Sequence, residues 1–284
     1  MSPYLWQPID DLPENWSNLR SSQLEILINA WKNRVQQLQG LTILETFKDS
    51  LRSEWLSEVD ILEYLYSTDR GTTQVIIEKG IEFSLPTISS EVRLAELSVP
   101  KKIEGLFVFV TKERNLSVFY IKELHQALTR NQATTWAQDS FENLVEIPLL
   151  HGQWKYQSNN PKRPDGIIHQ YCPPEQVISE MERLVEMHNN HLEMGVPPEI
   201  EAAWLHHRFT QIHPFQDGNG RVARTLASLI FIRQGLFPIV ITRNDRQEYI
   251  NASEAADSGD LTGLINLFSR LQEKILIKGL GLRA

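Results

Sequence analysis

The sequence predicts an all-α fold, in which a helical bundle with one β-hairpin is joined to an N-terminal helical module. Apolar residues recur at helical spacing through most of the 284 residues. A polar, turn-rich stretch over residues 131–176 interrupts this pattern and holds the one clear pair of strand-like segments. Gly235, Gly259 and Gly263 separate the helices that follow.

The first hundred residues form the predicted N-terminal module. Residues 21–39 and 43–66 carry apolar side chains on one helical face, and Gly40 ends the first of these helices. Residues 72–81 fit a helix or a strand, and residues 94–114 fit a helix. We therefore expect two units, residues 1–100 and residues 101–284.

The second unit has clearer helix boundaries. Ser117 is the expected N-cap of a helix that runs through Thr129. Residues 175–191 have a strong helical period, and Pro197-Pro198 opens the next helix, because proline is tolerated in the first turn. Residues 152–156 and 167–171 flank a run of turn residues, which predicts the two strands of the hairpin.

Composition narrows the class of function. The net charge is −8 and the pI about 5.5, which argues against binding to nucleic acid through bulk charge and disfavours a DNA-binding regulator. The single cysteine, Cys172, excludes an intrachain disulfide and a cysteine-based zinc site. No stretch is apolar enough to span a membrane and no signal peptide is recognisable, so we expect a cytoplasmic protein without membrane contact.

Residues 213–224, with the sequence His-Pro-Phe-Gln-Asp-Gly-Asn-Gly-Arg-Val-Ala-Arg, stand apart from the rest. A glycine-containing turn that feeds a helix exposes backbone N–H groups at the positive end of the helix dipole, which suits phosphate. Gly218 and Gly220 let a ligand approach the backbone closely. Arg221 and Arg224 are three residues apart, so both guanidinium groups lie on the face that clamps phosphate oxygens.

Two further residues of this stretch suggest a reaction. Asp217 would repel a bare phosphate, but it becomes useful when Mg²⁺ bridges it to phosphate oxygens. His213 ends the preceding helix and has an unperturbed pKa suited to a general base, while Phe215 anchors the turn in the core. The pattern predicts group transfer from a magnesium nucleotide to a nucleophile that His213 deprotonates.

Residues 213–224 resemble the signature of the Fic domain, His-Pro-Phe-x-Asp-Gly-Asn-Gly-Arg-x-x-Arg, at every fixed position. Residues 169–174, which end in Pro-Pro, look like the exit of the flap hairpin of this family. Residues 235–238 and 249–260 look like its downstream helices. The resemblance covers roughly residues 103–275 and implies an all-α bundle with one β-hairpin flap.

The resemblance implies a role for each matching residue. Fic enzymes mostly transfer AMP from ATP to a hydroxyl group of a protein and release pyrophosphate. His213 would be the general base, Asp217 would bind Mg²⁺, and Tyr249 would lie near the nucleoside. The phosphates would be held by Gly218, Asn219, Gly220, Arg221 and Arg224. The flap that aligns the target segment would consist of Ile168, His169, Gln170, Tyr171 and Cys172.

Many Fic proteins carry an inhibitory glutamate on an additional helix, in the pattern Ser/Thr-x-x-x-Glu-Gly/Asn. Glu63 stands at a comparable place upstream, but Val59 and Tyr64 depart from the pattern. Glu78, with Gln74 in place of Ser/Thr, is the second candidate. The prediction is that the N-terminal module regulates the enzyme through Glu63, which reaches Arg224 and blocks the γ-phosphate.

Several alternatives stay open. The same site could remove AMP from a modified protein, with Glu63 orienting a water molecule, or transfer UMP or phosphocholine. The phosphate-transferring branch of the family usually has lysine at the position of Gly220, which disfavours it. An adaptor that binds nucleotide or protein without chemistry is the alternative of a different class. The expected partners are ATP, Mg²⁺ and a protein with a Ser, Thr or Tyr hydroxyl; a homodimer is an open question.

The remaining histidines have bland interpretations. His125 is expected to pack in the core. Adjacent helix positions face different sides, so one of His206 and His207 is expected to be packed and the other solvated.

Overall fold

The computed structural model describes residues 5–69, 114–138, 144–161 and 168–283, and for residues 56–69 it describes the backbone alone. The described helices are α1 (Ser22–Leu38), α2 (Thr42–Asp69), α6 (Val118–Thr129), α7 (Val177–Met194), α8 (Pro198–Ile212), α9 (Asn219–Arg233), α10 (Arg246–Asp257) and α11 (Thr262–Leu280). The described residues also contain three short 3₁₀ helices, Trp16–Leu19 before α1, Pro174–Gln176 before α7 and Arg243–Asp245 before α10. The strands β1 (Thr134–Gln138) and β2 (Leu144–Pro148) form one two-stranded sheet, so the predicted mostly helical fold is confirmed.

Local signals set the helix ends, and the expected N-cap of α6 is confirmed. Ser117 caps α6 by accepting a hydrogen bond from Tyr120 N at 3.1 Å, and Ser21 caps α1 in the same way from Leu24 N. Gly195 ends α7 in the left-handed conformation, with φ of 69°. No helix among the described residues is long and apolar enough to cross a membrane.

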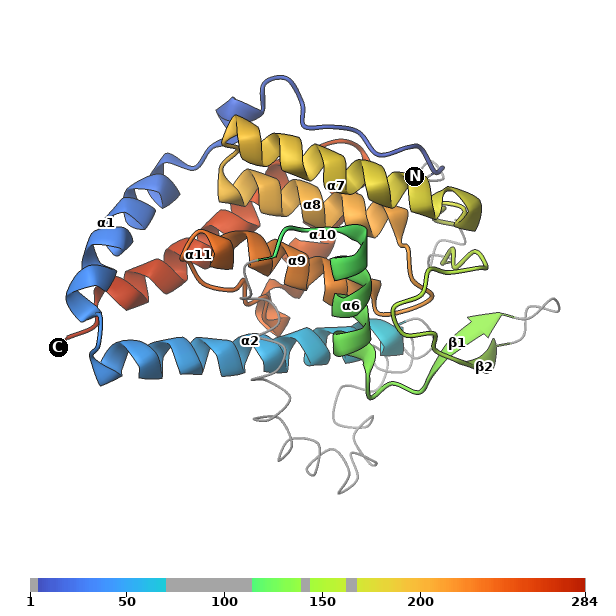
Figure 1. The fold of residues 1–284 in the computed structure, drawn as a ribbon, viewed down its shortest axis with the longest axis horizontal. Coiled ribbons are helices and arrows are strands. Elements are labelled where there is room, and N and C mark those ends of the chain that lie inside the picture. Colours follow the sequence, from blue (N-terminus) through green and yellow to red (C-terminus); the bar gives the residue numbers. More distant parts are fainter. Residues whose placement is uncertain (1–4, 70–113, 139–143, 162–167, 284) are drawn as a thin grey trace.

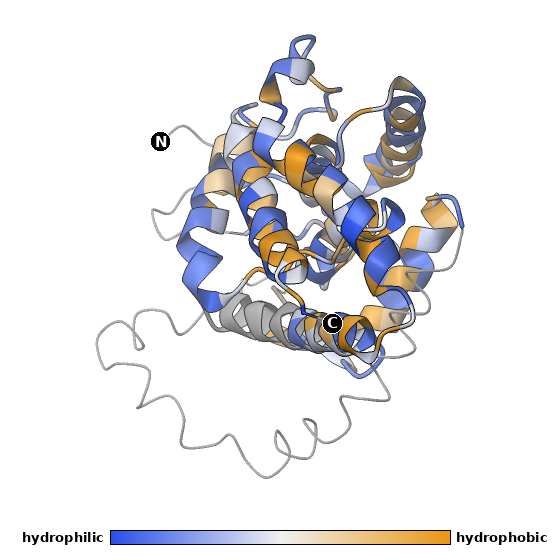
Figure 2. Ribbon diagram, turned by 90° about the vertical axis from the view of Figure 1, so that its left-hand side faces the viewer, coloured by the Kyte–Doolittle hydropathy of each residue, from blue (hydrophilic) through white to orange (hydrophobic). Residues whose placement is uncertain are grey.

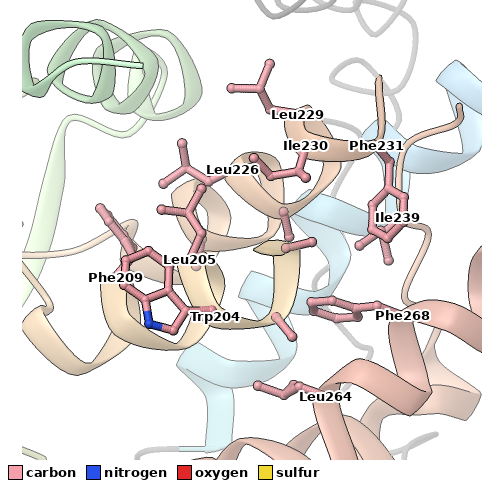
Figure 3. Close-up of a cluster of buried hydrophobic side chains, with 14 of the residues drawn as sticks. Trp204, Leu205, Phe209, Leu226, Leu229, Ile230, Phe231, Ile239, Leu264 and Phe268 are labelled. Carbon is pink, nitrogen blue, oxygen red and sulfur yellow. The ribbon is translucent and has the colours of Figure 1, made fainter. Parts of the chain in front are cut away.

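Helices α8 and α9 form the centre of the bundle (Figure 1). Almost every side chain of α8 is buried, its charged residues included. Hydrophilic and hydrophobic residues occur together along single helices of the bundle (Figure 2). Figure 3 shows the apolar cluster that the two helices share, with Trp204 and Phe209 from α8, Leu226 from α9 and Phe268 from α11. This close packing fixes the corner between α8 and α9, where residues 213–218 lie.

The N-terminal helices pack onto the same bundle. Helix α1 lies against α11, and α2 contacts α9 (Figure 1). The side chains of Trp31 and Trp55 are completely or almost completely buried in the core. The expected boundary at residue 100 falls in residues 70–113, outside the described residues, as do Glu78 and most of the helix expected at residues 94–114.

The prediction for the hairpin strands was wrong. The antiparallel ladder joins β1 and β2, with Thr135 opposite Ile147, and residues 152–156 form no strand. The physical reason is that this segment bonds elsewhere: Lys155 N donates to Pro214 O at 2.8 Å instead of to a partner strand. The β-branched and aromatic residues of β1, Thr134, Thr135 and Trp136, were the signal that the polar surroundings obscured.

Candidate active site

The chain turns sharply where α8 ends, at the first residue of the motif. His213 has φ of 52° and ψ of 56°, the one left-handed residue other than glycine in the described part of the chain. Its N–H still donates to Phe209 O at 3.0 Å, so the residue closes the helix as expected. Such a conformation costs of order 1–3 kcal/mol, and it persists where the surrounding structure holds it.

The imidazole of His213 is half-buried, and contacts with Thr210 and Tyr171 orient it. Nδ1 lies 3.3 Å from Thr210 O, and because a carbonyl can only accept, Nδ1 carries the proton in this bond. The lone pair is then on Nε2, which is the nitrogen that can act as a base. The ring stacks on Tyr171, with centroids 3.8 Å apart and planes within 5° of parallel.

Phe215 and Asn219 stabilise the interior of the loop. The Phe215 ring is completely buried and stacks on His125 at 3.8 Å, as its predicted anchoring role requires. Asn219 Oδ1 accepts from Phe215 N at 2.9 Å and Asn219 Nδ2 donates to Phe215 O at 2.8 Å. The amide side chain of Asn219 is thereby used inside the loop, so this residue can reach a phosphate only through its backbone N–H.

The N-terminus of α9 faces the site without a side-chain cap from the described residues. Gly218, the residue before the helix, has φ of 77°. A Cβ atom there would lie 2.7 Å from Thr129 Cγ2, so both the conformation and the space demand glycine. The first-turn N–H groups of a helix lack intrahelical acceptors and bind anions, which matches the predicted phosphate cradle.

Arg221 and Arg224 lie one turn apart on α9, and both are more than nine-tenths buried. Arg221 Nη2 donates to Gln132 Oε1, whereas Arg221 Nε is buried with no hydrogen-bond partner among the described residues. A buried guanidinium with an unpaired N–H is costly unless a ligand supplies the acceptor. The structure therefore brings together the two cations and the helix terminus that the sequence predicted as one site.

Asp217 is held in its ionised form. Its Oδ2 accepts from Gln132 Nε2 at 2.6 Å and from Thr135 Oγ1 at 2.9 Å, and its Oδ1 accepts from Gly218 N at 2.6 Å. Burial acts to raise the pKa of Asp217, but these hydrogen bonds and the charge of Arg221 outweigh burial and hold the pKa below its usual value.

Besides Thr135, two further residues that sequence reasoning did not assign to the site contribute to it. Gln132, after α6, joins Asp217 to Arg221 through its amide. His125, on α6, donates from Nε2 to Asp217 O at 3.0 Å and accepts at Nδ1 from Gly152 N at 2.8 Å. Burial lowers the pKa of His125 to about 4, so the ring is neutral and acts as a structural link. Both residues lie over eighty positions from the motif, so no local pattern could reveal them.

The prediction that one of His206 and His207 is solvated was wrong, because both are buried. Helix α8 lies inside the bundle, so both of its sides meet other helices. His206 Nε2 bonds to Tyr249 Oη at 2.8 Å, and burial, aided by the charge of Arg224, lowers the pKa of His206 to about 3. Tyr249 is buried in this contact, and its expected place near a nucleoside stays a prediction.

The predicted flap residues form an extended segment that leads to Pro173. His169 N donates to Pro161 O at 3.0 Å, so residues 159–161 and 168–171 lie side by side. Ile168 is half-exposed, whereas the side chains of His169 and Cys172 are buried. Burial raises the pKa of the Cys172 thiol to about 12, which disfavours a reactive thiolate.

Glu63 lies on α2, in the part of this helix of which the structure describes the backbone alone. Helix α2 contacts α9, the helix that carries Arg224. The contact between Glu63 and Arg224 stays a prediction.

Comparison with known proteins identifies this arrangement. The model of the Fic/DOC family matches residues 115–231, which extend from just before α6 into α9 and contain the whole motif. Residues 115–231 form a Fic/DOC domain. The Fic domain thus includes His125, Gln132 and the β1–β2 hairpin as well as the residues of the motif.

Relatives and solved structures extend the similarity of this Fic domain beyond the motif. Protein adenylyltransferase fic-1 of Caenorhabditis briggsae is 32% identical over 213 residues, which cover 74% of this chain and 38% of that protein. Protein adenylyltransferase Fic of Nematostella vectensis is 32% identical over 114 residues, or 38% of this chain and 26% of that protein. The chain therefore spans well under half the length of these relatives.

The fold is similar to those of solved Fic proteins. A Fic domain containing signaling protein from Bacteroides thetaiotaomicron superposes with a TM-score of 0.66 at 25% identity, over 91% of this chain and 96% of that one. Residues 134–508 of Fic-1 from Caenorhabditis elegans superpose with a TM-score of 0.62 at 21% identity, over 91% of this chain and 71% of that one. The second similarity shows the fold alone.

Proposed function

We propose that this chain is a protein adenylyltransferase that moves AMP from ATP to a hydroxyl side chain of a target protein or of itself. The observation that carries the proposal is the loop of residues 213–218, which has the lone pair of His213 Nε2 at one end and the uncapped N-terminus of α9 at the other. The names of the relatives, protein adenylyltransferases, support the same reaction.

The reaction follows from these groups. His213 Nε2 takes the proton of the target hydroxyl as its oxygen attacks the α-phosphorus of ATP. The bond from this phosphorus to the bridging oxygen breaks, and pyrophosphate leaves. The backbone N–H groups at the start of α9, with Arg221 and Arg224, stabilise the charge on the phosphate oxygens. Residues 168–172 hold the target segment by adding a strand to it.

Asp217 suits a Mg²⁺ ion whose remaining ligands are oxygens of the substrate phosphates and water. It is ionised, and Oδ1 accepts one hydrogen bond, so a lone pair stays available for the cation. Mg²⁺ in nucleotide sites is held by one or two carboxylates together with phosphates and water. Within the described residues, no group of three or more His, Cys, Asp or Glu side chains is placed to hold a metal ion. When bound, Mg²⁺ neutralises phosphate charge.

We propose that the helices before the Fic domain inhibit the enzyme through Glu63. The contact between α2 and α9 supports this proposal, because it brings the helix of Glu63 to the helix of Arg224. A carboxylate paired with Arg224 would occupy the place of the γ-phosphate. Replacing Glu63 with glycine is then expected to raise the rate of transfer.

The test is transfer of label from ATP in the presence of Mg²⁺ and candidate target proteins. With ATP labelled at the α-phosphate, we expect label on protein from the wild type, more label from Glu63→Gly, and at least about 100-fold less from His213→Ala. Mass spectrometry should find a gain of one AMP. Nucleotide binding without label in the wild type and in Glu63→Gly would contradict the proposal and favour an adaptor. In a parallel reaction with ATP labelled at the γ-phosphate, label on protein would indicate phosphate transfer. Loss of AMP from a modified protein would indicate the removal of AMP.

A further inference from the structure

The ring of Tyr171 covers one face of the proposed base. The two rings are 3.8 Å apart and nearly parallel, which is the closest aromatic approach of His213 in the described structure. Tyr171 is half-buried and lies in the segment that the sequence assigned to target binding. A ring stacked flat against the imidazole leaves the edge of the imidazole, which carries both nitrogen atoms, turned away from the stack.

The imidazole needs such a contact. The terminal torsion of histidine is broad, so the backbone alone does not set the direction of Nε2. The hydrogen bond from Nδ1 to Thr210 O is 3.3 Å long, beyond the usual range for N–H···O bonds. The flat contact with Tyr171 restricts the same torsion, because rotation of the imidazole would drive its edge into the phenol ring.

Tyr171 is itself fixed to the loop that it supports. Its N–H donates to Asn160 Oδ1 at 2.9 Å, and the neighbouring Asn159 donates from Nδ2 to Phe215 O at 2.8 Å. Lys155 N donates to Pro214 O at 2.8 Å, and Lys155 Nζ lies 5.8 Å from the centre of the Tyr171 ring. Residues 155–160 thus connect Tyr171 with the turn of residues 213–216.

A second anchor comes from α10. The ring of His169 is 4.8 Å from the ring of Tyr171, and His169 Nδ1 lies 3.7 Å from Asp257 Oδ2 at the end of α10. His169 is buried, so this contact joins the segment to the bundle at a second place. The position of the phenol ring is therefore determined from residues 155–160 and from α10.

We propose that Tyr171 is a positioning residue for His213, and that its ring directs Nε2 toward the hydroxyl of the target. This inference rests on the proposed function of His213 as the base. The stacking of the Tyr171 ring on His213 then raises the rate of the chemical step. The hydroxyl group of Tyr171 and its contacts with a target contribute less.

Two substitutions of Tyr171 separate the ring from its hydroxyl. Tyr171→Phe keeps the stack, and we expect a transfer rate within about two-fold of the wild type. Tyr171→Leu removes the stack but fills similar space, and we expect kcat to fall roughly 10- to 100-fold, the effect of small misplacements of catalytic groups. The affinity for ATP, measured by calorimetry, should stay the same in both. Phe119→Leu, at an exposed aromatic residue of α6 that has no part in holding Tyr171, is the control and should behave as the wild type.

A measurement that needs no activity distinguishes this inference from the proposed function. The ring current of Tyr171 should shift the carbon-bound ring protons of His213 upfield in NMR spectra, in the wild type and in Tyr171→Phe, and the shift should disappear in Tyr171→Leu. If the wild type transfers no label but shows this pattern, the proposed function fails and the stack is established. Equal kcat in Tyr171→Leu and the wild type would overturn the positioning role, as would a Tyr171→Phe variant as slow as Tyr171→Leu.

Discussion

Histidines lie near both ends of helix α8, and the two places differ in how the imidazole is held. Near its start, Glu201 binds His188 and His191 of α7, both at 2.6 Å, and His191 Nε2 binds Asp11 of the N-terminal segment at 2.6 Å. At its end, His213 has a long bond to one carbonyl and a stacked ring. Carboxylates bind both nitrogens of His191, so this residue links α7 with α8 and with the N-terminal segment. His213 is oriented mainly by the stacking of its ring on Tyr171.

The cluster near the start of α8 attaches residues 5–12, here called the N-terminal strap, to the bundle. Trp204 Nε1 and Arg208 Nε donate to Asp10 O at 3.0 and 2.9 Å, and Ile9 N donates to Glu180 Oε2 at 2.9 Å. Burial acts to lower the pKa of His191, but the two carboxylates outweigh it and raise the pKa above its usual value. Charge thus contributes to stability at this end, whereas at the other end a neutral base is needed for chemistry.

Replacing His213 or His191 with alanine gives the largest expected effects, the first on the rate of transfer and the second on stability. His213→Ala should lower transfer by about 10²- to 10⁴-fold, the usual contribution of a general base. Its free energy of unfolding should change little, because the ring is half-buried. His191→Ala should keep its rate when folded but lose about 3–5 kcal/mol of stability, since Glu201 then stays buried with one fewer partner. Labelled transfer and urea unfolding on both variants check this contrast, which an equal loss of stability would contradict.

The glycine at the loop offers a smaller effect with a matched control. Gly218→Ala meets Thr129 Cγ2 at 2.7 Å at φ of 77°, whereas Gly235→Ala at φ of 73° meets nothing within 4 Å. Both pay for a left-handed alanine, but only the first is crowded, so we expect it to be less stable by a further 1–3 kcal/mol, roughly the range for overpacking. Its affinity for ATP should also fall. Thermal unfolding and calorimetry measure both effects, and equal losses in the two variants would refute the crowding.

The pH dependence of stability should have opposite signs at two histidines. His191 has a raised pKa in the folded state, so its contribution is complete below the unfolded pKa of about 6.5 and is lost as pH rises through the folded pKa. His206 has a folded pKa of about 3, because burial and Arg224 disfavour its charged form. The unfolded chain therefore gains a proton at His206 below about pH 6.5, and stability falls as pH decreases toward 3.

Urea unfolding from pH 5 to 8 measures these two contributions. Relative to the wild type, His191→Gln should be most destabilised at pH 5 and least at pH 8. His206→Gln should lose the part of the acid destabilisation that His206 causes, which is about 1.4 kcal/mol per pH unit at most. Parallel curves for both variants and the wild type would contradict the assignment of opposite charge states.

The sequence was sufficient for the site that lies within one stretch of chain. A turn, a helix start and two arginines three residues apart are local features, and the structure keeps them together around Gly218. Gln132 and His125 could not be predicted, because only the packing of α6 against α9 brings them to Asp217. The hairpin was misplaced because residues 152–156, which flank a turn-rich run in the sequence, bond to the motif loop in the fold instead of to a partner strand.

The pairing of β1 with β2 has one more consequence. Along β1, Thr135 is buried and donates to Asp217, whereas its neighbour Trp136 is two-thirds exposed. Alternate residues of a strand face opposite sides, so a slip of one position would remove the hydroxyl and present an indole to the carboxylate. The register of the β1–β2 pair therefore decides whether Asp217 receives the hydrogen bond from Thr135, and with it the charge distribution on the carboxylate that would face a cation.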